Sequence, residues 1–179
     1  MSGSWPVRCY IGLGGNLGDP RARLEEALRQ LAHLPLTRLE AVSPFYRNPP
    51  LGPADQPDYV NAVARLETRL SAVRLLCLLQ AVEERAGRQR SGERWGPRTL
   101  DLDLLLYEDR VMRGELLTIP HPGVAVRAFV LRPLYDLDPA LVLPDGRAVA
   151  ALLGELGDGE LVEVRRDQYP RRGLRGDES

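Results

Sequence analysis

The spacing of apolar residues predicts four strands before residue 108. Residues 5–12 and 36–47 are runs of strand length, the second with a bulge at Ser43-Pro44. Residues 59–68 alternate between apolar and polar, which is typical of a half-buried strand. Residues 98–107, RTLDLDLLLY, form a short apolar run bounded by turn residues and predict the fourth strand.

Helical spacing and capping residues predict two helices between these strands. Asp19 is suited to cap a helix with Pro20 at its first position, and leucines recur on one face of the segment that follows. Ser71 is suited to cap a second helix, which ends near Gly87.

The resulting order is βαββαβ, which indicates an α+β fold with a ferredoxin-like core: an antiparallel sheet with two helices on one face. A hairpin that reaches Thr118, a shorter helix over 124–136 and small elements up to Val164 extend this core. We therefore expect a single domain over residues 1–165 and a mobile tail over 166–179.

Composition narrows the function only a little. The chain has 179 residues, 44% of them hydrophobic, and a net charge of -1, so no global charge favours nucleic acid or a membrane. All 24 basic residues are arginine, so arginine must do any cationic work in a site. Cys9 and Cys77 lack metal-ligand spacing, and we expect no signal peptide before them. We expect two reduced core cysteines in a cytoplasmic protein.

A glycine-rich stretch, GLGGNLGD from Gly12 to Asp19, invites comparison with a dinucleotide-binding loop. That fingerprint requires a glycine where Leu17 stands, and no parallel βαβ pattern follows. We interpret the stretch instead as a flexible turn that lets the backbone approach another group closely.

Two aspartates interrupt the fourth predicted strand. Asp101 and Asp103 are two residues apart, so on a strand both side chains point to one face, roughly 7 Å apart. One explanation is a salt-bridge network with Arg94 and Arg98. The other is a holder for Mg²⁺, which prefers carboxylate oxygens and shares phosphate ligands with a substrate.

The neighbouring segments supply matching groups. Four arginines and Trp95 fall in a glycine-containing loop over 88–98, which suggests a lid that holds a polyphosphate. Tyr59 and Asn61 share a strand face, either as ordinary edge packing or as a slot for a flat polar heterocycle. Phe129 would form the opposite wall of that slot. His121, in a turn, is either structural or a donor to phosphate.

Four segments together carry a resemblance to a known family. They are GLGGNLGD, SPFYRNPPLGPADQPDYVNAV, GRQRSGERWGPRTLDLDLLLY and IPHPGVAVRAFVLRPLYDLDP. In this order they resemble the 6-hydroxymethyl-7,8-dihydropterin pyrophosphokinases of folate biosynthesis. The resemblance implies a ferredoxin-like fold, with transfer of pyrophosphate from ATP to the hydroxymethyl group of the reduced pterin and release of AMP. It also implies mobile loops near 16–20, 48–58 and 88–97.

The resemblance assigns roles residue by residue. Asp101 and Asp103 would bind two Mg²⁺ ions and, with Arg88 and Arg98, form the catalytic group. The pterin would contact Asn48, Leu51, Tyr59, Asn61 and Phe129, the first two through their backbone. ATP would contact Gln80, Glu83, Arg90, Trp95, Leu104, Thr118, His121 and Arg127, with Leu104 and Thr118 using their backbone.

Some positions depart from the family pattern. Ser91 and Leu116 stand where some members have lysine and arginine, Asn48 replaces a threonine, and Pro122 replaces a tyrosine. The expected partners are ATP and the pterin, without nucleic acid or membrane, for a monomeric enzyme.

Two other functions are compatible with parts of the pattern. The first is a metal-dependent nucleotidyl transferase or cyclase, which would release pyrophosphate instead of AMP. The second is an RNA-binding module of similar topology, which the two strand aspartates disfavour because they would repel an RNA backbone.

Overall fold

The computed structural model of the protein describes residues 6–52, 55–87 and 99–164. Its strands are β1 (Val7–Gly15), β2 (Thr37–Val42), β3 (Phe45–Asn48), β4 (Tyr59–Thr68), β5 (Asp101–Tyr107), β6 (Met112–Arg113), β7 (Thr118–Ile119) and β8 (Val162–Val164). Its helices are α1 (Pro20–Ala32), α2 (Ala72–Arg85), α3 (Ala128–Leu137) and α4 (Val149–Leu156). None of these helices is long and apolar enough to cross a membrane, within the part of the chain described.

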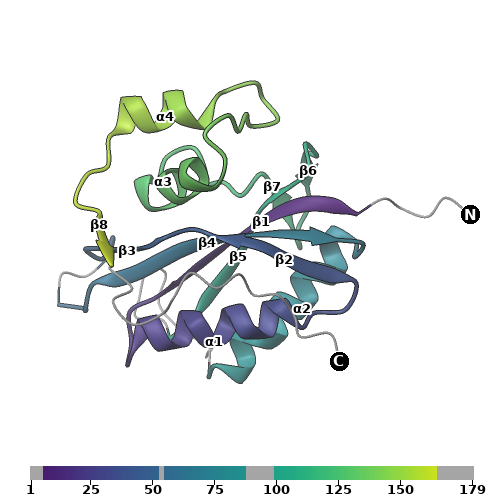
Figure 1. The fold of residues 1–179 in the computed structure, drawn as a ribbon, viewed down its shortest axis with the longest axis horizontal. Coiled ribbons are helices and arrows are strands. Elements are labelled where there is room, and N and C mark those ends of the chain that lie inside the picture. The colour runs from purple at the N-terminus through teal and green to yellow at the C-terminus, as the bar shows by residue number, and fades with distance from the viewer. Residues whose placement is uncertain (1–5, 53–54, 88–98, 165–179) are drawn as a thin grey trace, which may run out of the picture.

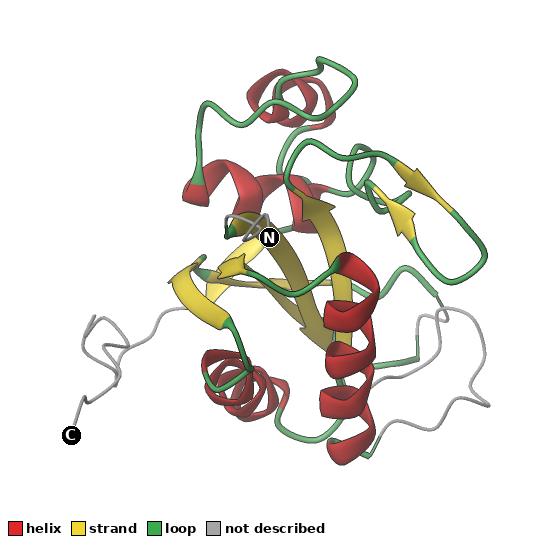
Figure 2. Cartoon of the chain, turned by 90° about the vertical axis from the view of Figure 1, so that its right-hand side faces the viewer, coloured by secondary structure: helices red, strands yellow, loops and turns green. Residues whose placement is uncertain are grey.

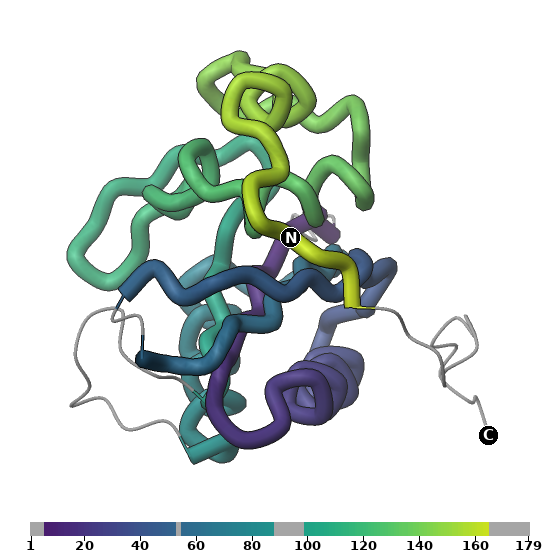
Figure 3. The backbone as a smooth tube through the Cα atoms, turned by 90° about the vertical axis from the view of Figure 1, so that its left-hand side faces the viewer, coloured from purple at the N-terminus to yellow at the C-terminus, as the bar shows by residue number. Residues whose placement is uncertain are grey.

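One antiparallel sheet organises the molecule. Its strands follow the order β5-β1-β4-β3-β8. Strand β2 also pairs with β4, at residues 64–68, whereas β3 pairs with residues 59–61 of the same strand. Strand β8, near the end of the described chain, lies beside β3 (Figure 3). Strands β6 and β7 form a separate hairpin. Because β1 lies between β5 and β4, residues of all three strands meet across the middle of the sheet.

Helices cover both faces of the sheet (Figures 1 and 2). Helices α1 and α2 lie on one face, where their leucines pack against apolar side chains of β1 and β4. Helix α3 lies on the opposite face, with α4 outside it, and packs on Tyr10, Val63 and Leu105. The expectation of helices on one face only was therefore incomplete. The sheet is a central layer, and strands buried on both faces carry near-continuous apolar runs.

The local helix signals are confirmed. The Asp19 carboxylate accepts a hydrogen bond from the Ala22 amide at 3.2 Å, and the Ser71 hydroxyl accepts one from the Arg74 amide at 3.2 Å. These side chains satisfy amides that a helix leaves unpaired at its first turn. Gly87 follows α2 with φ +87°, a conformation that glycine adopts readily.

Several element boundaries differ from the prediction; the strand predicted over 98–107, for example, begins at Asp101. The predicted strand over 36–47 is two strands that part at Ser43 and Pro44. The third helix begins at Ala128, four residues after the predicted start, because the chain is still extended at Arg127, with φ -121° and ψ 115°. The glycines from Gly12 to Gly15 lie within β1 and not in a flexible turn.

The prediction that both cysteines lie in the core holds only for Cys9. That thiol is fully buried, and burial raises its pKa to about 12, which makes it unreactive. Cys77 is exposed on α2, because the buried face of that helix is set by Leu75, Leu79 and Val82. Neither cysteine is in a disulfide.

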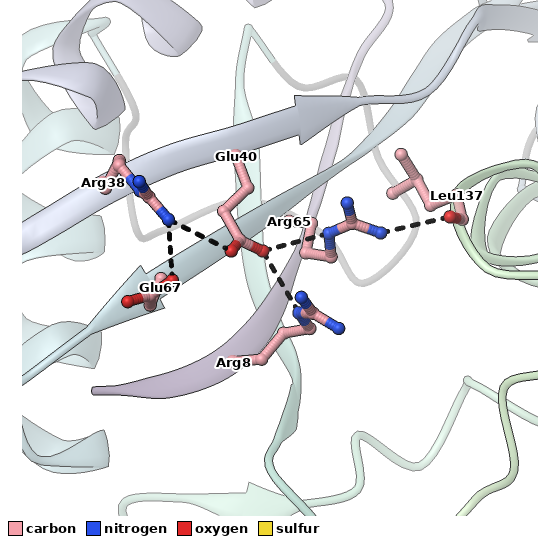
Figure 4. A network of polar contacts seen from close by, with 6 residues as sticks. All are labelled: Arg8, Arg38, Glu40, Arg65, Glu67 and Leu137. Carbon is pink, nitrogen blue, oxygen red and sulfur yellow. Dashed lines mark hydrogen bonds and ion pairs between the residues drawn. The ribbon is translucent and has the colours of Figure 1, made fainter. Parts of the chain in front are cut away.

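An ion-pair network occupies the sheet face where α3 ends (Figure 4). Glu40 of β2 lies at its centre, and its Oε2 atom accepts hydrogen bonds from Arg8 and Arg65, each at 3.1 Å. Arg65 also donates to the Leu137 carbonyl at 3.1 Å, which ties the sheet to the end of α3. Burial alone would raise the pKa of Glu40, but hydrogen bonding and the charges of these arginines outweigh it and lower the pKa.

This network predicts a specific dependence of stability on pH. Because the pKa of Glu40 is lower in the folded protein, its contribution is present above the unfolded pKa of about 4.3 and is lost as the pH falls through the folded value. We expect Glu40→Gln to melt at a lower temperature than the wild type at pH 7. This difference in melting temperature should become smaller below about pH 4. Thermal melts of both proteins across this range test it. A deficit that is equal at every pH would contradict the prediction.

Candidate active site

The floor of the site is made by two glycines in the central strand. Gly14 of β1 lies opposite Asp101 of β5 on one side and Asn61 of β4 on the other. Gly12 lies opposite Asp103 in the same way. Successive residues of a strand face opposite ways, so these positions share one face of the sheet. The two glycines add no side chain of their own to this face, so the side chains of Asn61 and Leu105 can lie close against the backbone of β1.

A cavity of about 280 Å³ opens above this floor. It brings together residues that the sequence assigned to the metal, to ATP and to the pterin: Asp101, Asp103, Arg127, Asn48, Leu51, Tyr59, Asn61 and Phe129. Helix α3 and the residue before it form the wall opposite the sheet, since Arg127, Phe129 and Val130 all line the cavity. Strand residues and helix residues far apart in the chain therefore meet at one place.

The two carboxylates have the chemistry of a magnesium holder. Both lie partly exposed on the same face of β5 and line the cavity. Among the residues described, no group of three or more His, Cys, Asp and Glu side chains gathers as a metal cluster. Two carboxylates suit Mg²⁺, which keeps water ligands and takes further oxygens from substrate phosphates. The donor set therefore fits an ion that binds together with a phosphate-containing substrate.

A short turn places His121 next to these carboxylates. The His121 amide donates to the Leu105 carbonyl at 2.9 Å, which fastens the turn to β5. The Nε2 atom of His121 lies 3.8 Å from Oδ1 of Asp103. His121 does not itself line the cavity, so it stands at the edge of the site on the carboxylate side.

The opposite end of the cavity is polar but closely packed. The Nδ2 atom of Asn61 donates to Oδ1 of Asn48, and Asn48 in turn donates to the Pro49 carbonyl at 3.0 Å. Both asparagines are buried, with only 7% of each residue exposed. Sequence reasoning assigned only the backbone of Asn48, and the structure shows that its side chain fixes the amide of Asn61.

A further buried pair was missed at the sequence level. Asn16, after β1, is 1% exposed and donates to Gln56 at 3.1 Å and to the Pro57 carbonyl at 3.0 Å. These bonds join two segments that the resemblance names as loops of the site. In the sequence, Asn16 and Gln56 are simply two polar residues in loops. Polar residues are common in loops, so nothing marks these two as a buried pair.

Other predicted residues lie elsewhere. Gln80 and Glu83 are on α2, Glu83 is only 3% exposed, and neither lines the cavity described above. Leu104 is buried on β5, and Thr118 is exposed on β7, also outside the cavity lining. Arg88, Arg90, Arg94, Trp95 and Arg98, with the departure at Ser91, lie outside the described residues.

Comparison with known proteins gives a consistent result. A sequence model of the family 7,8-dihydro-6-hydroxymethylpterin-pyrophosphokinase (HPPK) matches residues 10–139. The chain is 53% identical to the 2-amino-4-hydroxy-6-hydroxymethyldihydropteridine pyrophosphokinase of Pseudomonas aeruginosa, over 82% of this chain and 90% of that protein. It is 45% identical to the enzyme of the same name from Haemophilus influenzae, over 88% of this chain and 98% of that one.

A solved structure shares the fold at low identity. Plasmodium falciparum HPPK-DHPS, crystallised with pteroate, superposes with a TM-score of 0.67 and 13% identity. The match covers 84% of this chain but 42% of that longer protein, so the likeness concerns one part of it.

Proposed function

Because the chain belongs to the 7,8-dihydro-6-hydroxymethylpterin-pyrophosphokinase family, we propose here how its cavity performs the reaction of that family. The protein transfers pyrophosphate from ATP to the hydroxymethyl group of 6-hydroxymethyl-7,8-dihydropterin, a step of folate biosynthesis. A bond forms between the hydroxymethyl oxygen and the β-phosphorus, and the hydroxyl group gives up its proton. The bond from that phosphorus to the oxygen bridging the α-phosphorus breaks, and AMP leaves.

The arrangement across β1 carries the proposal. Two carboxylates and a buried asparagine lie on either side of a glycine floor, in one cavity. We assign the carboxylate side to the phosphates of ATP and the asparagine side to the pterin. The hydroxymethyl group then lies over the floor, between the two, so that the reacting atoms meet without bringing a side chain between them.

The pterin side offers both stacking and hydrogen bonding. Tyr59 and Phe129 line the cavity from β4 and α3, and would contact the flat ring from its two sides. Asn61 would bind its polar edge, since an amide both donates and accepts. The hydrogen bond to Asn48 already holds that amide in one orientation, so little side-chain freedom is lost when the pterin binds.

The phosphate side combines carboxylates with cationic groups. Asp101 and Asp103 would hold Mg²⁺, and we propose two ions, in keeping with the resemblance. When bound, Mg²⁺ neutralises phosphate charge and lowers the pKa of an attached hydroxyl group. Arg127 adds a guanidinium from the opposite wall, and His121 can donate a hydrogen bond from the edge. The catalytic roles of Arg88 and Arg98, and the ATP contacts of Gln80, Glu83, Arg90, Trp95, Leu104 and Thr118, stay predictions.

The product assay tests this assignment directly. Incubation with ATP, Mg²⁺ and the pterin should yield AMP and the pterin diphosphate in equal amounts. A nucleotidyl transferase built on similar carboxylates would release pyrophosphate instead. Recovery of pyrophosphate in place of AMP would contradict the proposed placement of the β-phosphorus.

We expect Asn61→Ala to weaken pterin binding by about 1–3 kcal/mol, because a buried polar edge of the ligand loses its partner. ATP binding should change little, because Asn61 lies across the floor from the carboxylates. Calorimetry with each ligand separately measures both affinities. An equal loss for the two ligands would show that Asn61 supports the fold and not the pterin alone.

The finer description of the fold is also a proposal. If β2 and β3 count as two halves of one broken strand, the sheet order β5-β1-β4-β3 corresponds to a ferredoxin-like core, and α3, α4 and β8 are the C-terminal additions. The single domain over 1–165, the monomeric state and the cytoplasmic location stay predictions. The predicted tail over 166–179 lies outside the described residues.

A further inference from the structure

Gly123 occupies a turn between two of the proposed phosphate-side residues. Its amide donates a hydrogen bond to the Nδ1 atom of His121 at 3.0 Å. With Nδ1 accepting, the ring turns its Nε2 atom toward Asp103. Arg127, the N-cap residue of α3, comes four residues later, so Gly123 lies between His121 and Arg127 in the sequence. Gly123 is itself buried.

Gly123 also lies directly against the guanidinium of Arg127. A Cβ atom added to Gly123 would be 2.6 Å from Cζ and Nε of Arg127 and 2.8 Å from its Nη1. These distances are far shorter than any normal van der Waals contact. The backbone of Gly123 does not have a positive φ, so its conformation alone does not require glycine. The space taken by the guanidinium therefore supplies the reason for a glycine at this position.

The guanidinium also lies near an aromatic ring. Its Cζ atom lies 5.8 Å from the centre of the Phe129 ring, within the range of a cation–π contact. Arg127 and Phe129 both line the cavity that contains the two carboxylates. A planar guanidinium acts through its orientation, because its donors form a rigid fork. Any side chain at position 123 would force that fork to move.

We propose that Gly123 is a positioning residue for the transfer reaction: its missing side chain leaves the space that the Arg127 guanidinium occupies at the cavity wall, and its amide orients His121. The proposal rests on the proposed role of Arg127 in binding ATP. Arg127 is the flexible partner in this contact, so a methyl group at position 123 displaces the side chain more readily than the backbone. Gly123→Ala should therefore lose function while the fold persists.

A double-mutant cycle of Gly123→Ala and Arg127→Ala tests this directly. We expect Gly123→Ala to lower kcat/KM for ATP about tenfold in the wild-type background and less than about twofold when Arg127 is already alanine. Its melting temperature should stay within about 2 °C of the wild type. Gly154→Ala is the matched control, because a Cβ added there meets nothing within 4 Å, and full activity is expected.

The possible results distinguish the role of Gly123 from the role of Arg127 in binding ATP. A tenfold loss that persists in the Arg127→Ala background overturns the inference but leaves the role of Arg127 intact. Wild-type kcat/KM in Arg127→Ala overturns both. If Gly123→Ala alone unfolds, the same cycle is read in melting temperature. The Arg127→Ala background should then restore a folded protein, and failure to do so overturns the inference.

Discussion

Replacing Asp103 with alanine is expected to lower turnover by about a thousandfold or more while the protein stays folded. Asp101→Ala should act similarly, because both carboxylates line the same cavity and neither can take over the other's position on the strand. Like charges on one strand face repel each other, so removing one relieves repulsion in the protein without its metal. The melting temperature should therefore not fall with the activity.

Controls distinguish a magnesium role from a general loss of charge. Asp103→Asn keeps the shape of the side chain but is a weaker ligand for Mg²⁺, so it should be nearly as inactive as alanine. Asp109→Ala removes an exposed aspartate from the turn just after β5 and should keep full activity. Activity and thermal melts of the four variants, each over a range of Mg²⁺ concentrations, check this. Near-normal turnover in either alanine variant at ordinary Mg²⁺ would refute the metal assignment.

What the sequence could predict depended on the range of the interaction. Asp19 and Ser71 were correctly identified as helix caps because a cap bonds to amides only a few residues away. The strand over 59–68 was also correct to its ends, because its alternation follows from its own side chains. Such signals are local, so they remain visible without knowledge of the fold.

The predictions were wrong where the local structure depends on glycines or on tertiary packing. Glycines carry no side chain, so Gly12–Gly15 show no strand period, although pairing with β4 and β5 makes them extended. The segment before Arg127 looks helical by its apolar spacing, but Val124 and Val126 bond to the carbonyls of His121 and Gly123 in turns, and Arg127 is extended ahead of α3. No pattern in the chain shows that Gly123 contacts Arg127, since that packing exists only in the folded protein.

The site itself was predictable in its charged residues but not in its architecture. Asp101 and Asp103 stand out because charges are rare in apolar strands. That they face Asn61 across a strip of glycine follows from the strand order, which brings β5 and β4 to either side of β1. The sequence therefore identifies the residues at the two ends of the site, and the order of the strands determines how they are placed relative to each other.

This strip predicts a second large effect, at Gly14. A Cβ atom added there would lie 2.5 Å from Oδ1 of Asn61, well inside van der Waals contact. Asn61 has little room to move, because its amide is buried and bonded to Asn48. We expect Gly14→Ala to weaken pterin binding about 100-fold, the loss of the Asn61 contact combined with overpacking of the floor.

The neighbouring glycine offers a matched comparison. A Cβ added to Gly12 would meet only the side chain of Leu105, at 3.3 Å and beyond, and a leucine can shift by a few tenths of an ångström. Gly12→Ala should therefore weaken the pterin affinity much less than Gly14→Ala. Calorimetric titration of the pterin into both variants and into the Asn61→Ala protein provides the comparison. Because Gly14→Ala is expected to act through Asn61, most of its penalty should disappear when Asn61 is already alanine. If instead the full penalty remains in that background, the floor acts on the ligand itself or on the strand, and Asn61 is not the group that Gly14 accommodates.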